Sequence, residues 1–268
     1  MIPLERLYEA EGLPAGELPA ELERLYDGTL ALEEPRLYAN FVATLDGVVA
    51  IPSIPESNTV VAAGSRADHF VMGLLRALAD VVLIGAGVLR AAPQGTWLPE
   101  KVYPPAAGAF AELRRQRGRP ERPEVAVLTG RGSIDPAHPL LASGAVVLTS
   151  ERGADHLGRS LPAASTALAL GDDVELPASA IVAALHDRGH RLILAEAGPH
   201  AFGSLLEGRA VDELFLTYSP LLAGDAGPDS RLRVVEAADL LPPVELRLLS
   251  LRRHEQHLFA RYELPARA

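Results

Sequence analysis

The feature that most constrains the fold is a strand, tight turn and helix pattern over residues 191–208. The apolar run Leu192–Ala195 has the length and composition of a buried strand. Glu196 follows, then the small turn Ala197-Gly198-Pro199, and from His200 apolar residues recur at helical spacing. In an α/β sheet such a turn lies at the carboxyl end of its strand, where ligands bind. The first N–H groups of the helix would favour a phosphate there, with Glu196 as the nearby carboxylate. An ordinary strand-to-helix connection with a surface glutamate explains the same residues.

The rest of the chain alternates predicted strands with predicted helices. Buried strands are expected at residues 37–43, 81–84, 125–129, 145–149, 167–170 and 211–218, and helices at residues 66–79, 108–117 and 178–188. The last two apolar-polar alternations, 244–251 and 257–264, indicate an antiparallel pair. This order predicts an α/β protein with a mostly parallel sheet covered on both faces. Residues 91–107 are Pro-rich, hold the one tryptophan and are expected to form a long loop of the kind that often acts as a lid.

Composition excludes several classes of protein. The 268 residues contain no cysteine, so disulfides and cysteine chemistry are ruled out. Lys101, the one lysine, lies in a Pro-rich loop, which argues against pyridoxal-phosphate and P-loop chemistry. A net charge of −10 argues against a nucleic-acid partner. No run is long enough to cross a membrane and no signal peptide is evident, so we expect a cytoplasmic protein.

The first 34 residues differ in composition from the rest of the chain. They are acidic, and the spacing of Leu18, Leu22 and Leu25 predicts a short amphipathic helix. We therefore expect an N-terminal extension over residues 1–34 and the main domain over residues 35–268.

Other polar residues leave more than one interpretation open. Gly85-Ala86-Gly87 follows a predicted strand, but Arg90 stands where a dinucleotide fingerprint needs its third glycine. His254 and His257 lack an evident third metal ligand, as do His186 and His190, so solvated surface positions are favoured over a metal site. Arg76 is either a helix arginine that extends to solvent or an anion ligand. Asp46 is either a turn former or a contact to a polar substrate.

Three separated motifs resemble the riboflavin-biosynthesis pyrimidine reductase family, whose fold is dihydrofolate-reductase-like. They are ANFVATLDG (39–47), GSRADHFVMGLLRALADVVLIGAGV (64–88) and ILAEAGPHAFGSLLEGRAVDELFLTYSPLLAG (193–224). The resemblance runs from about residue 36 to the end of the sequence, without the deaminase domain often fused in front. It implies a three-layer α/β/α domain, a homodimer, and NADPH-dependent reduction of the ribosyl group of a small aminopyrimidine ribosyl phosphate to ribityl, by hydride transfer to C1′.

The resemblance also implies roles for particular residues. Glu196 and Asn40 would be catalytic, and Asp46, Ser65 and Arg76 would bind the substrate. Thr129 and Thr149 would contact the adenosine half of NADPH. The remaining cofactor contacts would come from Ala43, Gly85, Ala86, Gly87, Val88, Ala197, Gly198, Pro199, His200 and Ala201. No metal is implied.

The sequence departs from the family pattern at three places. Val88 replaces a threonine, and Ala197 and His200 alter the usual Glu-Gly-Gly-Pro-Thr. Residues 92–99 also lack the acid and the arginine of the loop that binds the substrate phosphate. Two alternatives therefore stay open: a reductase of this fold acting on a different heterocyclic or carbonyl substrate, and a non-catalytic nucleotide-binding relative.

Overall fold

A ten-stranded mixed sheet organises the part of the chain that the computed structural model describes, residues 2–54, 56–225 and 230–265. Its strand order is β1-β11-β12-β9-β2-β8-β4-β5-β6-β7. Neighbours from β9 through β7 run parallel, whereas β12, β11 and β1 add antiparallel strands at one edge, which confirms the predicted mixed sheet. The strands are β1 (Glu5–Glu9), β2 (Arg36–Ala43), β4 (Val81–Gly85), β5 (Glu124–Leu128), β6 (Val146–Thr149), β7 (Thr166–Ala169), β8 (Leu192–Glu196), β9 (Glu213–Tyr218), β11 (Arg247–His254) and β12 (His257–Glu263), and a separate two-stranded sheet pairs β3 (Val48–Ala50) with β10 (Leu232–Arg233).

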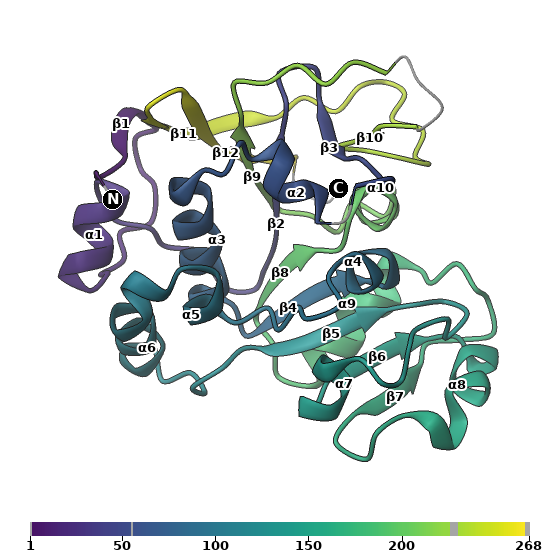
Figure 1. Ribbon diagram of the computed structural model, residues 1–268. Helices are drawn as coiled ribbons and strands as arrows, with labels where there is room; N and C mark the ends of the chain where they lie inside the picture. Colours follow the sequence, from purple (N-terminus) through teal and green to yellow (C-terminus); the bar gives the residue numbers. More distant parts are fainter. Residues whose placement is uncertain (1, 55, 226–229, 266–268) are drawn as a thin grey trace.

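Helices cover both faces of this sheet and complete the three predicted layers (Figure 1). The helices α1, α3, α5 and α6 pack together on one face and share one apolar core, and α9 and α10 share a second core with the other face. The helices are α1 (Ala20–Tyr26), α2 (Ser57–Val61), α3 (Arg66–Leu78), α4 (Ala86–Ala91), α5 (Pro99–Val102), α6 (Ala107–Gln116), α7 (Pro139–Ser143), α8 (Glu151–Leu157), α9 (Ala178–Asp187) and α10 (Pro199–Glu207), with short 3-10 turns at Pro104–Ala106 and Gly158–Ser160. Within the described residues, no helix is both long and apolar enough to span a bilayer.

Helix α3 is the element that later positions the site, and both of its ends are satisfied locally. The Ser65 hydroxyl accepts a hydrogen bond from the Asp68 N–H at 3.2 Å, which makes Ser65 the N-cap as predicted. At the other end the buried Arg114 guanidinium donates to the carbonyls of Ala77 and Ala79 at 3.1 and 2.7 Å. Midway, the Tyr38 hydroxyl donates to the Leu75 carbonyl at 2.8 Å and fastens the helix to β2.

The loop predicted at residues 91–107 is shorter than expected, because only residues 92–98 form an uninterrupted loop. Helix α5 and a 3-10 turn occupy much of this stretch. Trp97 is buried, with its ring centroid 6.3 Å from that of His138. The His138 Nε2 lies 3.0 Å from the Ala92 carbonyl and ties the start of the segment to α7. Burial of the indole, together with that of Pro99, Tyr103 and Ala106, anchors this segment to the core, while its role as a lid stays a prediction.

The N-terminal extension is integrated into the same sheet. β1, which the sequence did not predict, pairs with β11, and α1 contributes Leu22 and Leu25 to the core beside α3. The buried Arg252 guanidinium lies 3.9 Å above the Tyr26 ring and donates to the Tyr26 carbonyl at 2.8 Å and to Glu9 at 2.7 Å. Residues 5–32 are therefore held by the C-terminal strands.

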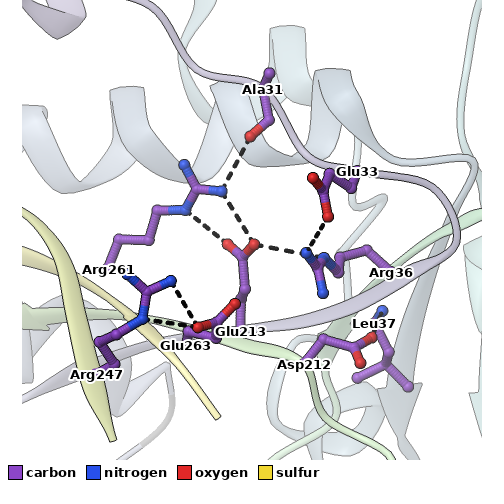
Figure 2. Close-up of polar contacts among 9 residues, drawn as sticks. All are labelled: Ala31, Glu33, Arg36, Leu37, Asp212, Glu213, Arg247, Arg261 and Glu263. Atoms are coloured by element: carbon purple, nitrogen blue, oxygen red, sulfur yellow. Dashed lines mark hydrogen bonds and ion pairs between the residues drawn. The ribbon is translucent and has the colours of Figure 1, made fainter. Parts of the chain in front are cut away.

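A buried ion pair joins the parallel and antiparallel parts of the sheet. The Arg261 guanidinium of β12 donates to both carboxylate oxygens of Glu213 on β9, at 2.6 and 3.0 Å. It also donates to the Ala31 carbonyl at 3.0 Å, and the Arg36 Nε approaches Glu213 to 3.6 Å from the start of β2 (Figure 2). Three segments distant in sequence, residues 31–36, β9 and β12, thus meet at this ion pair.

Loss of this pair is expected to destabilise the fold strongly. Arg261→Met should lower the free energy of unfolding by about 3–5 kcal/mol, because it leaves the Glu213 carboxylate buried without its main partner. Urea unfolding followed by circular dichroism measures the change. Arg253→Met, which removes the exposed pair with Glu5, is the matched control and should cost less than about 1 kcal/mol. Equal effects of the two substitutions would contradict this account.

Candidate active site

The predicted catalytic residues lie side by side at the carboxyl edge of the parallel strands. The register pairs Ala39 of β2 with Ala195 of β8, so the next residues along the two strands, Asn40 and Glu196, are neighbours. Both side chains are on the face covered by α3, because Tyr38, two positions before Asn40, bonds to α3 and Glu196 contacts Arg76 of the same helix. The sheet therefore brings Asn40 and Glu196 together in front of one helix.

Arg76 and Glu196, predicted to have separate roles, form one ion pair. The Arg76 Nε lies 3.1 and 3.2 Å from the two carboxylate oxygens of Glu196, and its Nη2 lies 2.6 Å from Oε2. The two side chains are 11% and 10% exposed, so the pair is shielded from bulk water but not sealed from it. A forked contact of this kind fixes the orientation of the carboxylate. Arg76 is thus not an arginine that extends to solvent, and its contact with substrate stays a prediction.

The two small-residue turns, one after β4 and one after β8, meet. Gly85, at the end of β4, packs so closely on the turn after β8 that a Cβ there would lie 2.4 Å from the Ala197 carbonyl oxygen. Gly198 has φ +82°, and a Cβ on it would lie 3.1 Å from Val88 Cγ2. Position 85 thus requires glycine because the Ala197 carbonyl packs against it. Position 198 favours glycine because its φ is positive.

Helix α10 begins directly at this junction. Pro199 is its first residue, which suits a position whose N–H would have no helical acceptor. By helix geometry the N–H groups of His200 and Ala201 also lack an acceptor within the helix. The turn therefore presents donors and the positive end of a helix dipole at the carboxyl edge, where a phosphate would be stabilised.

Two predicted substrate contacts already have partners within the chain. The Ser65 oxygen caps α3. The Asp46 carboxylate accepts from the Thr44 hydroxyl at 2.5 Å and from the N–H groups of Ala223 and Gly224 at 3.1 and 2.7 Å. These hydrogen bonds, that of Thr44 first, lower the pKa of Asp46 to about 2. Asp46 thus ties the turn after β2 to the loop after β9, and contact of Asp46 or Ser65 with substrate stays a prediction.

The residues predicted for the adenosine half of the cofactor lie at the ends of β5 and β6. Thr129 and Thr149 are both buried, and a Cβ on Gly153 would lie within van der Waals overlap of the Thr149 hydroxyl. The Thr149 side chain is therefore covered by α8. Ala43 is also buried, and its carbonyl accepts from the Ser219 N–H at 2.8 Å. A cofactor contact by these three residues stays a prediction.

Three polar residues near this edge were missed or misplaced by the sequence analysis. Asp68 and Thr217 are buried, and they are joined by a hydrogen bond between their side chains. His257, which we expected at the surface, is also buried, and its Nε2 lies 3.0 Å from the Ala62 carbonyl. In the sequence, Asp68 shows only as a lone acid in the first turn of a helix, and His257 as a histidine within an alternating strand. Both patterns are equally compatible with exposed residues, so neither could have predicted burial.

A cavity of about 500 Å³ lies at the opposite, amino edge of the sheet. Arg36 and Asp212 line it together with Arg247, Glu263 and Val182. None of the residues predicted for catalysis, substrate or cofactor borders this cavity. Among the described residues, no group of three or more His, Asp or Glu side chains is placed to hold a metal ion.

Comparison with known proteins identifies the family. Residues 35–258 match the family described as the RibD C-terminal domain, and the chain belongs to it. Among its relatives is the 2,5-diamino-6-ribosylamino-4(3H)-pyrimidinone 5′-phosphate reductase of Archaeoglobus fulgidus, which is 27% identical over 202 residues, 73% of this chain and 84% of the relative.

Solved structures share the fold. A pyrimidine reductase-like protein from Corynebacterium diphtheriae superposes with a TM-score of 0.67 at 21% identity, covering 87% of this chain and 93% of that one. The riboflavin biosynthesis reductase Rib7 of Saccharomyces cerevisiae gives a TM-score of 0.59 at 13% identity, covering 89% and 94%. At these identities the likeness shows the fold alone.

The contact between the two turns makes a testable prediction. Gly85→Ala should destabilise the protein by roughly 1–3 kcal/mol, because the methyl group overlaps the Ala197 carbonyl and forces the backbone to shift. Gly87→Ala, in the same turn, should be neutral or stabilising by up to about 1 kcal/mol, since its Cβ would meet only the far end of Arg90 at 4.0 Å and alanine favours the helix. Chemical unfolding of the two variants gives the comparison, and a Gly85→Ala variant as stable as Gly87→Ala would refute the close approach.

Proposed function

We propose that the protein is an NADPH-dependent pyrimidine reductase that converts the ribosyl group of an aminopyrimidine ribosyl phosphate to ribityl by hydride transfer to C1′. Family membership and the printed activity of the Archaeoglobus relative support the reaction class. The observation that carries the proposal is the junction of the Gly85 and Ala197 turns next to the Arg76–Glu196 pair. A backbone cradle and a fixed carboxylate are thereby placed at one edge of the sheet.

The residues at the junction fit a dinucleotide cofactor. Gly85 lets the backbones of the two turns touch, and the first N–H groups of α10 are suited to a pyrophosphate. We expect NADPH to be held by Gly85 to Val88 and Ala197 to Ala201. When bound, NADPH supplies the hydride.

The chemistry of the substrate defines what the protein must do. As the ribosyl ring opens, the C1′–O bond breaks, the ring oxygen takes a proton, and the attached nitrogen forms a C=N⁺ bond to C1′. Hydride then adds to C1′ and the π electrons return to nitrogen, so each turnover consumes one hydride and one proton. Glu196, fixed by Arg76, and the Asn40 amide are the polar groups placed to orient the ribosyl group and to hold or move that proton.

A second candidate is a reductase acting on a different heterocyclic or carbonyl substrate. It is favoured by residues 92–99, which carry no arginine and place Trp97 in the core, so this segment offers no cation to a substrate phosphate. Parallel assays with phosphorylated and dephosphorylated aminopyrimidine ribosides separate the two candidates. A homodimer, a cytoplasmic location and the non-catalytic alternative stay predictions.

The function is tested by binding and then by turnover. Fluorescence titration should show tight binding of NADPH and weaker binding of NADH. Addition of the aminopyrimidine ribosyl phosphate should then cause loss of NADPH absorbance with formation of the ribityl product. Binding without oxidation by any aminopyrimidine riboside would contradict the reaction, and no binding of either nucleotide would contradict the cofactor site.

Glu196→Gln should separate proton handling from cofactor binding. We expect kcat to fall about 10²- to 10⁴-fold, the usual range for loss of an acid–base group, while the Kd for NADPH stays unchanged. Glu124→Gln is the control, because Glu124 lies at the amino edge, where it binds Arg188 and His190. Full turnover by Glu196→Gln would eliminate this role.

A further inference from the structure

A carboxyl group with no cationic partner is buried beside the proposed site. Asp68 lies in the first turn of α3, ahead of Arg76 on the same helix, and is 3% exposed. No arginine or lysine of the described residues forms an ion pair with it. Burial of such a group is costly, and buried carboxyls without a cation are concentrated at functional sites.

The groups around Asp68 come from four elements. From β9 the Thr217 hydroxyl bonds to its carboxyl, and from β12 the His257 ring attracts its negative charge. Glu196 of β8 and Arg76 of α3 are also close enough for their charges to act on it. His69, next to Asp68 on α3, is partly buried and under the influence of Arg76. The register pairs Thr217 of β9 with Val42 of β2, two positions after Asn40, so the Asp68 carboxyl lies on the same face of the sheet as Asn40 and Glu196.

Asp68 changes its ionisation state at a mildly acidic pH. Burial raises its pKa to about 6, against the opposing effects of the Thr217 hydrogen bond and the His257 ring. Above that pH the Asp68 carboxyl carries a full negative charge in the interior. The charges of the nearby Arg76–Glu196 pair cancel each other. The ionised carboxylate is thus balanced by no arginine or lysine of the described residues, and the His257 ring is a neighbouring group that favours its charged form.

We propose that Asp68, held by Thr217, is an electrostatic positioning residue whose carboxylate stabilises the positive charge that develops on the substrate when the ribosyl ring opens. This inference rests on the proposed function, because the C=N⁺ bond is formed only in that reaction. A preorganised charge in a water-excluded interior acts on a developing charge far more strongly than in water. No proton needs to move through Asp68 itself.

The required form is the ionised one, so the sign of the pH dependence follows. Turnover should be constant above about pH 7 and fall tenfold per pH unit below about pH 6, as the carboxylate takes up a proton. Asp68→Asn should lower turnover in the pH-independent range (the plateau) roughly 100-fold, which is at the low end of the effect of removing a preorganised group. It should also abolish the fall in turnover at low pH (the acid limb). NADPH affinity should not change.

Thr217→Val should change the pH dependence of turnover in a different way from Asp68→Asn. The Thr217 hydrogen bond lowers the pKa of Asp68, so its removal should move the acid limb to higher pH while leaving the plateau within a fewfold of the wild type. His69→Gln tests the neighbouring titratable group, and Glu124→Gln tests a carboxyl at the far edge. Both controls should keep the wild-type limb. An acid limb retained in Asp68→Asn, or unmoved in Thr217→Val, would overturn the proposal.

A measurement without turnover tests the burial of the charge. The folded pKa of Asp68 lies above the unfolded value of 3.8, so the folded protein binds more protons between pH 4 and pH 6 and loses stability as pH rises through that window. Asp68→Asn should lack this loss, so its stability relative to wild type should increase from pH 4 to pH 6 in urea unfolding. An unchanged difference would overturn the proposal. Wild-type protein that shows the effect but never oxidises NADPH would instead refute the proposed function.

Discussion

The buried Glu213 carboxylate is the constraint on which the joining of the two halves of the sheet depends. Arg261 reaches it from the antiparallel strands, Arg36 approaches it from the central parallel strand, and the Ala31 carbonyl fixes the N-terminal extension to the same guanidinium. Apolar packing alone would tolerate small slips between these segments, whereas a forked ion pair has one good geometry. These contacts lie at the amino edge of the sheet, opposite the carboxyl edge where we propose the active site.

At the carboxyl edge, positions are set by backbone contact rather than by long side chains. The Gly85 and Ala197 turns touch, so the ends of β4 and β8 cannot move independently. Glu196 directly precedes one of these turns and forms an ion pair with Arg76. Its carboxylate is therefore held in position by both the sheet and α3. The turns are in contact in this chain although Val88 and Ala197 depart from the family pattern.

Much of this could be predicted from sequence because the relevant signals are local. The branched apolar runs of β4 and β8 and the Ser65 cap of α3 each determine a short element. The rest depends on partners distant in the chain. β1 is an edge strand with mostly exposed residues, so it shows no buried alternation. Trp97 does lie in a loop, but its burial depends on contacts with distant residues such as His138, and Asp68 was missed because nothing in its local sequence reveals that Thr217 and His257 lie beside it.

The pairing of β1 with β11 has a consequence for how the protein is made. Glu5 of β1 bonds to Arg253 of β11, and Glu9 to Arg252, across almost the full length of the chain. During synthesis β1 emerges long before its partner exists, and contacts of such large sequence separation form slowly. Until β11 and β12 have been translated, β1 and the β9 edge of the sheet lack their partner strands. A strand that is made early therefore joins the sheet only through strands that are made late.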